Sequence, residues 1–129
     1  MGYTGYMVLW TLLSLGIHQR EAHPPGIIEL NYRDYWVSPR TTYEDFRVRV
    51  FNNSNEPITI DKAIPSCGCV LVTIQKNRVT RKGPGEIYVA IVAKTVDPLQ
   101  PVTVDIYTSE NPSTPKRIYI RRAPAKHLQ

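Results

Sequence analysis

The sequence predicts an all-β fold, an immunoglobulin-like β-sandwich of about seven strands, on three observations. After residue 25, apolar and polar side chains alternate in short runs, and a period of two places them on opposite faces of a sheet. Turn-forming residues separate the runs at the intervals expected of an immunoglobulin-like sandwich. The 11 prolines are expected in turns or at strand ends, where a missing N–H breaks no ladder. The alternative arrangement of these strands is a small barrel.

The expected strands follow one another with turn signals between them. In the second run, for example, Phe46, Val48 and Val50 alternate with polar neighbours and are expected to face the core. The seven runs are 28–32, 46–51, 58–64, 70–74, 87–93, 102–108 and 117–121. The main turn signals are the segments rich in Asn, Gly or Pro at 52–57, 83–85, 97–101 and 111–115.

Length and composition limit the class of protein. The chain has 129 residues, of which 42% are hydrophobic and 21% charged, as in ordinary globular proteins. This length suits one domain that buries a core of its own, which argues against a two-domain enzyme. A bilayer-spanning helix needs roughly 20 apolar residues, and no apolar run approaches that length. The sequence therefore excludes a disordered chain and a multi-pass membrane protein.

The first residues have the pattern of a signal peptide. Met1–Gly16 carries no charged side chain, and Met7–Leu15 has the length of an apolar h-region. We expect cleavage after Gly16, with Ala22 as the later alternative; a first core strand or helix is the competing interpretation. The domains expected are then the signal peptide at 1–16, the sandwich at 26–123 and a basic tail at 124–129. The chain is expected in the periplasm or cell envelope of a bacterium.

Charge is unevenly distributed along the chain. The formal net charge is +5, and after Glu110 there are no acids, whereas Lys116, Arg117, Arg121, Arg122 and Lys126 follow. Such a segment suits peripheral contact with anionic lipid or polysaccharide, or else forms a solvated edge strand. Nucleic acid is not an expected partner of an exported protein.

Cys67 and Cys69 form the one motif with a chemistry of its own. A disulfide between them closes a very small ring, which is strained unless the middle residue is permissive, as Gly68 is. Strain makes such a bond a labile oxidant. The two thiolates also suit Cu(I), although no cofactor is expected from the rest of the sequence. The remaining alternatives are buried free thiols, pairing with another chain, and a covalent adduct that has no local signal.

Other chemistries lack the residues they need. A structural zinc site needs four ligands. The three histidines, His18, His23 and His127, all lie near the ends of the chain. Neither cysteine has a histidine base nearby in the sequence, the carboxylates form no pair, and Gly83-Pro84-Gly85 introduces a strand rather than a phosphate-binding helix. We therefore expect a protein that is not an enzyme; thiol–disulfide exchange is the only enzymatic interpretation with a motif behind it.

Several motifs together resemble a known family. They are the Asn-rich turn within Val50–Ile60, then Ser66-Cys67-Gly68-Cys69, then Gly83-Pro84-Gly85-Glu86, and then the run 104–108 before Asn111. In order and spacing, over Phe46 to Ile120, they are similar to the domain-of-unknown-function family number 1573. The resemblance implies a short exported bacterial protein or module with an immunoglobulin-like fold, akin to domains of cilium and centrosome proteins, and without an assigned activity. Val70 stands where this family usually has Thr.

Two functions follow as expectations. The first is a structural or binding module that docks another envelope protein through its loops and edge strands. Its candidate contacts are the aromatic residues Tyr35 and Trp36, which are also candidates for packing at the end of the sandwich, and the basic residues Arg121 and Arg122. The second is redox or soft-metal handling by Cys67 and Cys69. Arg47 and Arg49 would form a wider basic patch with Arg121 and Arg122 if the strands that carry them are neighbours.

Overall fold

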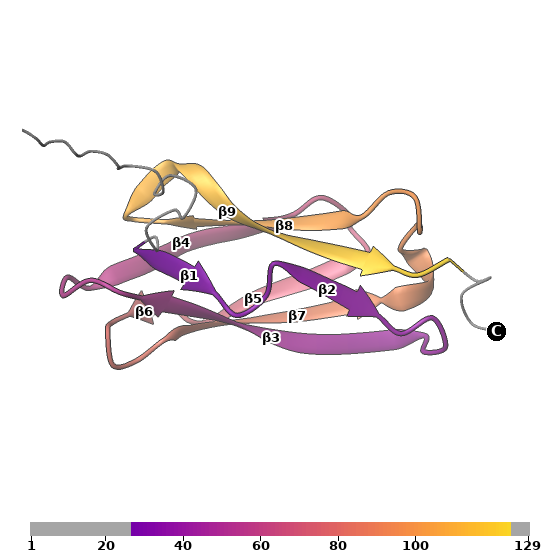
Figure 1. Cartoon of the computed structure of the whole chain (residues 1–129), viewed down its shortest axis with the longest axis horizontal. Coiled ribbons are helices and arrows are strands. Elements are labelled where there is room, and N and C mark those ends of the chain that lie inside the picture. Colours follow the sequence, from indigo (N-terminus) through magenta and orange to yellow (C-terminus); the bar gives the residue numbers. More distant parts are fainter. Residues whose placement is uncertain (1–26, 125–129) are drawn as a thin grey trace, which may run out of the picture.

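A computed structural model describes residues 27–124 and contains two β-sheets packed face to face (Figure 1). The first sheet is antiparallel, in the order β1 (Ile28–Leu30), β3 (Tyr43–Asn52), β7 (Gly85–Val92) and β5 (Val70–Lys76). The second has the order β2 (Asp34–Val37), β9 (Asn111–Arg122), β8 (Val102–Thr108), β4 (Ile58–Pro65) and β6 (Arg78–Val79). One 3-10 turn, η2 (Ala93–Thr95), follows β7. The fold is thus an all-β sandwich of two sheets rather than a barrel.

The core lies between the sheets and follows the alternation of the strands. In β3, Phe46, Val48 and Val50 are buried, whereas the residues between them are exposed. β8 repeats this pattern, with Val104 and Ile106 fully buried. Burying each aliphatic side chain contributes roughly 1.5–3 kcal/mol, so the period of two is the main cause of the fold. The predicted inward face of the second run is confirmed.

The strands differ from the prediction in number and in several boundaries, most of all at the start of the last strand. Two short strands, β2 and β6, were not expected, because neither is long enough to have a clear alternation. The predicted turn at 111–115 is wrong: these residues begin β9, so Pro112 and Pro115 lie inside a strand. The ladder between β8 and β9 shifts register between Ile106 and Thr108, and a bulge there tolerates proline because the missing N–H breaks no regular pair.

The first two strands divide between the sheets. β1 pairs with β3, and after residues 31–33 the chain crosses over to pair β2 with β9 in parallel. Aromatic rings fill this crossing: Tyr35 stacks on Phe46 with centroids 3.8 Å apart, and Tyr32 meets both rings edge-on. This packing holds β2 against the first sheet. A strand of four residues would be held only weakly by its pairing alone.

The expected leader at 1–16 and the end of the expected tail, 125–129, lie outside the described residues. Within residues 27–124 there is no helix of the length and hydropathy that crossing a membrane requires.

Candidate functional site

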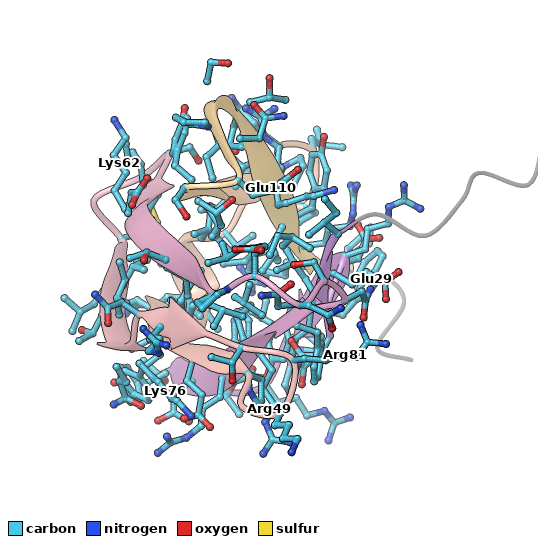
Figure 2. The ribbon with its side chains drawn as sticks, turned by 90° about the vertical axis from the view of Figure 1, so that its left-hand side faces the viewer. Glu29, Arg49, Lys62, Lys76, Arg81 and Glu110 are labelled. Carbon is cyan, nitrogen blue, oxygen red and sulfur yellow. A yellow bond between two sulfur atoms is a disulfide. The ribbon has the colours of Figure 1, made fainter. Side chains whose placement is uncertain are left out.

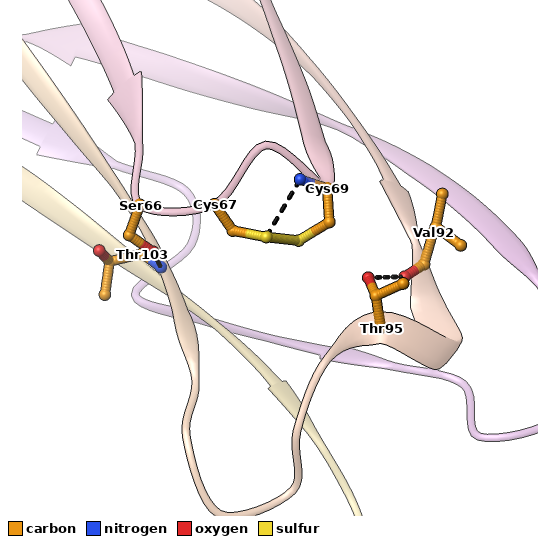
Figure 3. The surroundings of a disulfide bond; sticks show 6 residues. All are labelled: Ser66, Cys67, Cys69, Val92, Thr95 and Thr103. Carbon is orange, nitrogen blue, oxygen red and sulfur yellow. Dashed lines mark hydrogen bonds between the residues drawn. A yellow bond between two sulfur atoms is a disulfide. The ribbon is translucent and has the colours of Figure 1, made fainter.

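The Ser66–Cys69 turn carries the chain from β4 in one sheet to β5 in the other, at the end of the sandwich that also holds η2 (Figures 1 and 3). Cys67 and Cys69 are joined by a disulfide, with Cα atoms 5.2 Å apart. Of the alternatives for these cysteines, the structure therefore has the small-ring disulfide. In this state neither sulfur is a thiolate ligand for Cu(I). No group of three or more metal-ligating side chains exists in the described part of the chain.

Hydrogen bonds hold this turn on both sides. On the β8 side, Ser66 N–H donates to the Thr103 carbonyl over 2.8 Å, and Thr103 N–H donates to Ser66 Oγ over 2.9 Å. On the β7 side, Val92 N–H donates to the Cys69 carbonyl over 3.4 Å. Inside the turn, Cys69 N–H donates to Cys67 Sγ over 3.0 Å (Figure 3). The backbone of the turn is thus tied to both sheets by bonds other than the disulfide.

The glycine between the cysteines is open to solvent. Gly68 is exposed, and a Cβ built on it meets no atom within 4 Å. Its φ is not positive, so the turn does not need the special freedom of glycine that the sequence suggested. Cys67 and Cys69 themselves are half-buried, with their inner sides against the core.

A disulfide this short stabilises the fold little. The chain-entropy model gives about 3 kcal/mol for a 15-residue loop and about half of that for a loop of three. Removing so little entropy from the unfolded chain does not make the bond a structural staple. The disulfide therefore calls for a reason other than holding the sandwich together.

The four candidate contact residues lie together along β2 and the end of β9, where Trp36 is paired with Arg121. Three of them have partners within the fold. The Tyr35 hydroxyl donates to Glu44 over 2.5 Å, Arg121 pairs with Asp34 over 2.6 Å, and Arg122 donates to the Lys94 carbonyl over 3.0 Å. Trp36 is 59% exposed. Tyr35 therefore packs within the fold, whereas Trp36 is an aromatic side chain on the surface.

The wider basic patch does not form. Arg47 and Arg49 are on β3 of the first sheet, whereas Arg121 is on β9 of the second, so the two strands are not neighbours. Arg47 donates instead to Gln75 over 2.9 Å and lies 3.5 Å from a Glu86 oxygen.

A shallow groove of about 520 Å³ lies beside the aromatic crossing, and its polar groups bond to one another. Tyr88 donates to Asp45 over 2.7 Å, and this bond raises the pKa of the Tyr88 hydroxyl. Burial and then the bond to Glu44 raise the pKa of the Tyr35 hydroxyl. Both phenols are held in the neutral form, which does not suit a general base. The groove contains no nucleophile paired with a base among the described residues that line it.

The outer edge of β5, the side away from β7, is the feature that sequence reasoning missed. Ala93, the residue after β7, donates its N–H to Thr42 on the β3 side, while Val92 N–H of β7 bonds to Cys69 on the β5 side. Hydrogen-bonded pairs alternate along antiparallel strands, so Leu71 and Thr73 bond to β7. The N–H and C=O groups of Val72 and Ile74 therefore point outward. No strand within residues 27–124 pairs with this edge.

A signal for this edge was present in the sequence. Val70–Lys76 reads Val-Leu-Val-Thr-Ile-Gln-Lys, which is rich in β-branched residues, has one charge at its end and has no proline. Sequence alone does not say which strands are at the edge of a sheet, because that depends on the topology.

Two solved structures share the fold. One is the crystal structure of a protein of unknown function from Porphyromonas gingivalis W83, with a TM-score of 0.60 and 11% identity over 82% of this chain and 51% of that one. The other is the secreted serine protease VesC from Vibrio cholerae, with a TM-score of 0.52 and 13% identity over 78% of this chain and 25% of that one. This chain thus spans about half of the first and a quarter of the second. At these identities the similarity concerns the fold alone.

No curated protein matches the sequence. The model of the family described as "Protein of unknown function (DUF1573)" matches residues 37–122, so the resemblance drawn from the motifs is confirmed and the chain belongs to that family.

Proposed function

We propose that this chain is an exported, non-catalytic immunoglobulin-like module that binds another envelope protein by accepting one of its segments as an added strand on β5. The observation that carries the proposal is the outer edge of β5, where the backbone groups of Val72 and Ile74 point away from the sheet. An extended peptide gains affinity at such an edge through main-chain hydrogen bonds, and specificity through alternate side chains.

The other edges of the sandwich are protected by their length or their sequence. β1, β2 and β6 have only three, four and two residues. β3 before Val50 and β9 before Tyr119 therefore also reach an edge, but they carry several charges there and, in β9, two prolines. β4 reaches an edge beyond its short pairing with β6, but it carries the exposed charges Asp61 and Lys62 beside a bulge and ends at Pro65. Bulges, charges and proline are the usual protections of edge strands. β5 has seven residues and only Lys76 as a charge, so its edge is suited to a partner.

The partner strand that suits this edge is apolar and acidic. Leu71 is 62% exposed on the outer face of β5 and offers an apolar contact to a side chain on the added strand. Lys76, at the end of β5, lies on the same side of the sandwich as Arg49, whereas Lys62 lies on the opposite side (Figure 2). A chain of net charge +5 also attracts acidic partners more strongly than a second copy of itself. We therefore assign the edge to an extended segment in which apolar and acidic residues alternate.

Export and the immunoglobulin-like arrangement are parts of the same proposal. The charge-free Met1–Gly16 segment supports export to the periplasm or envelope of a bacterium. Two sheets in which all neighbouring strands except β2 and β9 are antiparallel, with β1 and β2 divided between the sheets, support an immunoglobulin-like arrangement. The basic residues at the end of β9 also support peripheral contact with polysaccharide or anionic lipid, because opposite charges attract.

The test is amide hydrogen exchange by NMR, with and without a synthetic peptide that alternates Val and Glu. In the free protein, Val72 and Ile74 N–H groups should exchange quickly, and Leu71 and Thr73 slowly. On peptide binding, Val72 and Ile74 should become protected. A control peptide with alternate backbone N-methylation should not bind, since it cannot form the ladder.

Two matched variants locate the site. Val72→Pro removes an outward N–H and no bond to β7, and should weaken peptide binding about tenfold, the equivalent of one hydrogen bond. Val72→Ala also loses the half-buried side chain but keeps the outward N–H, and should leave binding unchanged. Absence of peptide binding, or protection at β2 instead of β5, would overturn the proposal. Protection of β5 that appears with rising protein concentration alone would identify a second copy as the occupant in place of another protein.

A further inference from the structure

The Cys67–Cys69 disulfide closes a turn that is already held by other bonds. Ser66 is bonded to Thr103 of β8 by two hydrogen bonds, and the Cys69 carbonyl accepts Val92 N–H of β7. Opening the disulfide therefore leaves both strand connections in place. A bond that opens and closes without unfolding its surroundings is suited to redox chemistry rather than to stapling.

The turn is also accessible to a thiol. Gly68 is exposed with no atom near its missing Cβ, and both cysteines are only half-buried. In Figure 3 the disulfide lies between the Ser66–Thr103 contact on one side and Val92 and Thr95 on the other. Exchange requires an attacking sulfur to reach one of the two sulfurs, and the open Gly68 gives it space to do so.

The two sulfurs are not equivalent. Cys69 N–H donates to Cys67 Sγ over 3.0 Å, and a donor aimed at a sulfur stabilises it as a thiolate. Cys67 also lines a groove of about 190 Å³ with Ser66 and Gln100, which gives solvent access to a charge released on its sulfur. Asp97 lines the same groove and opposes that charge, although its carboxylate accepts Leu99 N–H over 2.9 Å. Cys67 is thus the better leaving group, since a leaving thiol of lower pKa departs faster.

We infer that this turn is a thiol–disulfide exchange site that oxidises a protein dithiol, with Cys69 as the attacked sulfur and Cys67 as the leaving group. A thiolate of the partner forms a bond to Cys69 Sγ, the Cys67–Cys69 bond breaks, and its electron pair goes to Cys67, which takes a proton from water. The partner's second thiolate then attacks the partner sulfur of this mixed disulfide and releases Cys69 as a thiolate, which is protonated in turn. Two electrons pass to this chain, and the partner leaves with a disulfide. The inference does not depend on strand addition at β5.

The test uses reduced glutathione as the thiol and the full chain in its oxidised form. Acid-quenched samples analysed by tandem mass spectrometry should contain the mixed disulfide on Cys69. The rate of reduction in the folded protein should be within about threefold of that in the same chain unfolded in urea, because the site is accessible. Asn55→Ala, an exposed position at the opposite end of the sandwich, is the control and should leave the rate unchanged.

Single-cysteine variants test the assignment of roles independently. Cys69→Ser leaves the Cys67 thiol with its N–H donor, and Cys67→Ser leaves the Cys69 thiol without one. At neutral pH the Cys67 thiol should be alkylated about threefold faster, because the N–H donor stabilises its thiolate. Asp97→Asn should increase the alkylation rate of Cys67 further.

Two results would overturn the inference. If the folded protein were reduced more than about tenfold slower than the unfolded chain, the disulfide would be shielded and inert. If glutathione were found on Cys67, or if the Cys69 thiol were alkylated faster than the Cys67 thiol, the assigned roles would be wrong.

Discussion

The sandwich has one end at β6 and another at the turn between β4 and β5 (Figure 1). Each end holds a glycine-containing motif, and the two motifs have opposite environments. At the end with β6, Asn52 is 3% exposed and its amide donates to the carbonyls of Glu56 and Val79. Gly85 there is enclosed by side chains from the other sheet. At the opposite end, Gly68 lies in open space between two bonded cysteines. The difference indicates that the first motif serves folding and that the second is available for chemistry.

The largest effect is expected from Asn52→Ala, which tests whether the first end depends on its hydrogen bonds. Asn52 Oδ1 also accepts Ser54 N–H and the Ser54 hydroxyl, so the side chain satisfies four groups. Removing it deletes all four of these hydrogen bonds at a buried position, and the free energy of unfolding should fall by about 3 kcal/mol. Urea denaturation measures the loss. Asn55→Ala, an exposed asparagine of the same turn, is the control and should change stability by less than about 0.5 kcal/mol.

The two glycines give a direct comparison of the ends. A Cβ at Gly85 would lie 2.7 Å from Ile60 Cδ1, 2.8 Å from Val79 Cγ2 and 3.0 Å from the Lys76 carbonyl oxygen. Gly85→Ala should therefore destabilise the fold by about 2 kcal/mol through overpacking. Gly68→Ala has room and should leave the free energy of unfolding within about 0.5 kcal/mol of the parent. Equal losses in thermal or urea denaturation would remove the distinction between the ends.

The sequence predicted those parts of the fold that depend on alternation. The buried positions of β3 and β8 follow directly from period two, because each inward side chain contributes its own burial. β2 was missed because its four residues are held by pairing with β9, some 85 positions away, and by the ring of Phe46. Pro112 and Pro115 were misplaced because a bulge in the β8–β9 ladder is not encoded in local pattern.

The candidate site, too, could be predicted from the sequence only in part. Cys67 and Cys69 were found from the sequence because both the residue type and the spacing carry chemistry. The outward backbone groups of Val72 and Ile74 were not found, since the identity of an edge strand depends on strand order. Likewise, only the structure could show that Arg121 is engaged by Asp34 rather than free for a partner.

Reduction of the disulfide should have a modest effect, which sharpens the comparison at the cysteine end. The ring restrains so few residues that the reduced protein should be less stable by about 1.5 kcal/mol. Urea denaturation with and without a reductant, and with the thiols alkylated after reduction, measures this difference. A loss of about 4 kcal/mol or more would make the disulfide a staple after all, and the cysteine end would then be structural like the other.

The smallest effect is expected from Tyr35→Phe, and it depends on pH. The hydroxyl of Tyr35 donates to Glu44, which also accepts Ser38 N–H over 2.8 Å, so near neutral pH the variant should lose about 1 kcal/mol. Burial and this bond raise the pKa of Tyr35 in the folded state. The contribution of the Tyr35 hydroxyl to the free energy of unfolding is therefore complete below the unfolded pKa of about 10 and declines as the pH rises above it.

Urea denaturation near pH 8 and near pH 11 measures this dependence, and the gap in free energy of unfolding between parent and variant should narrow at high pH. Tyr88, whose pKa is also raised, is present in both proteins and cancels from the difference. The absence of a gap at both pH values would mean that the ring stacking on Phe46, which the variant keeps, holds β2 in place without help from the hydroxyl.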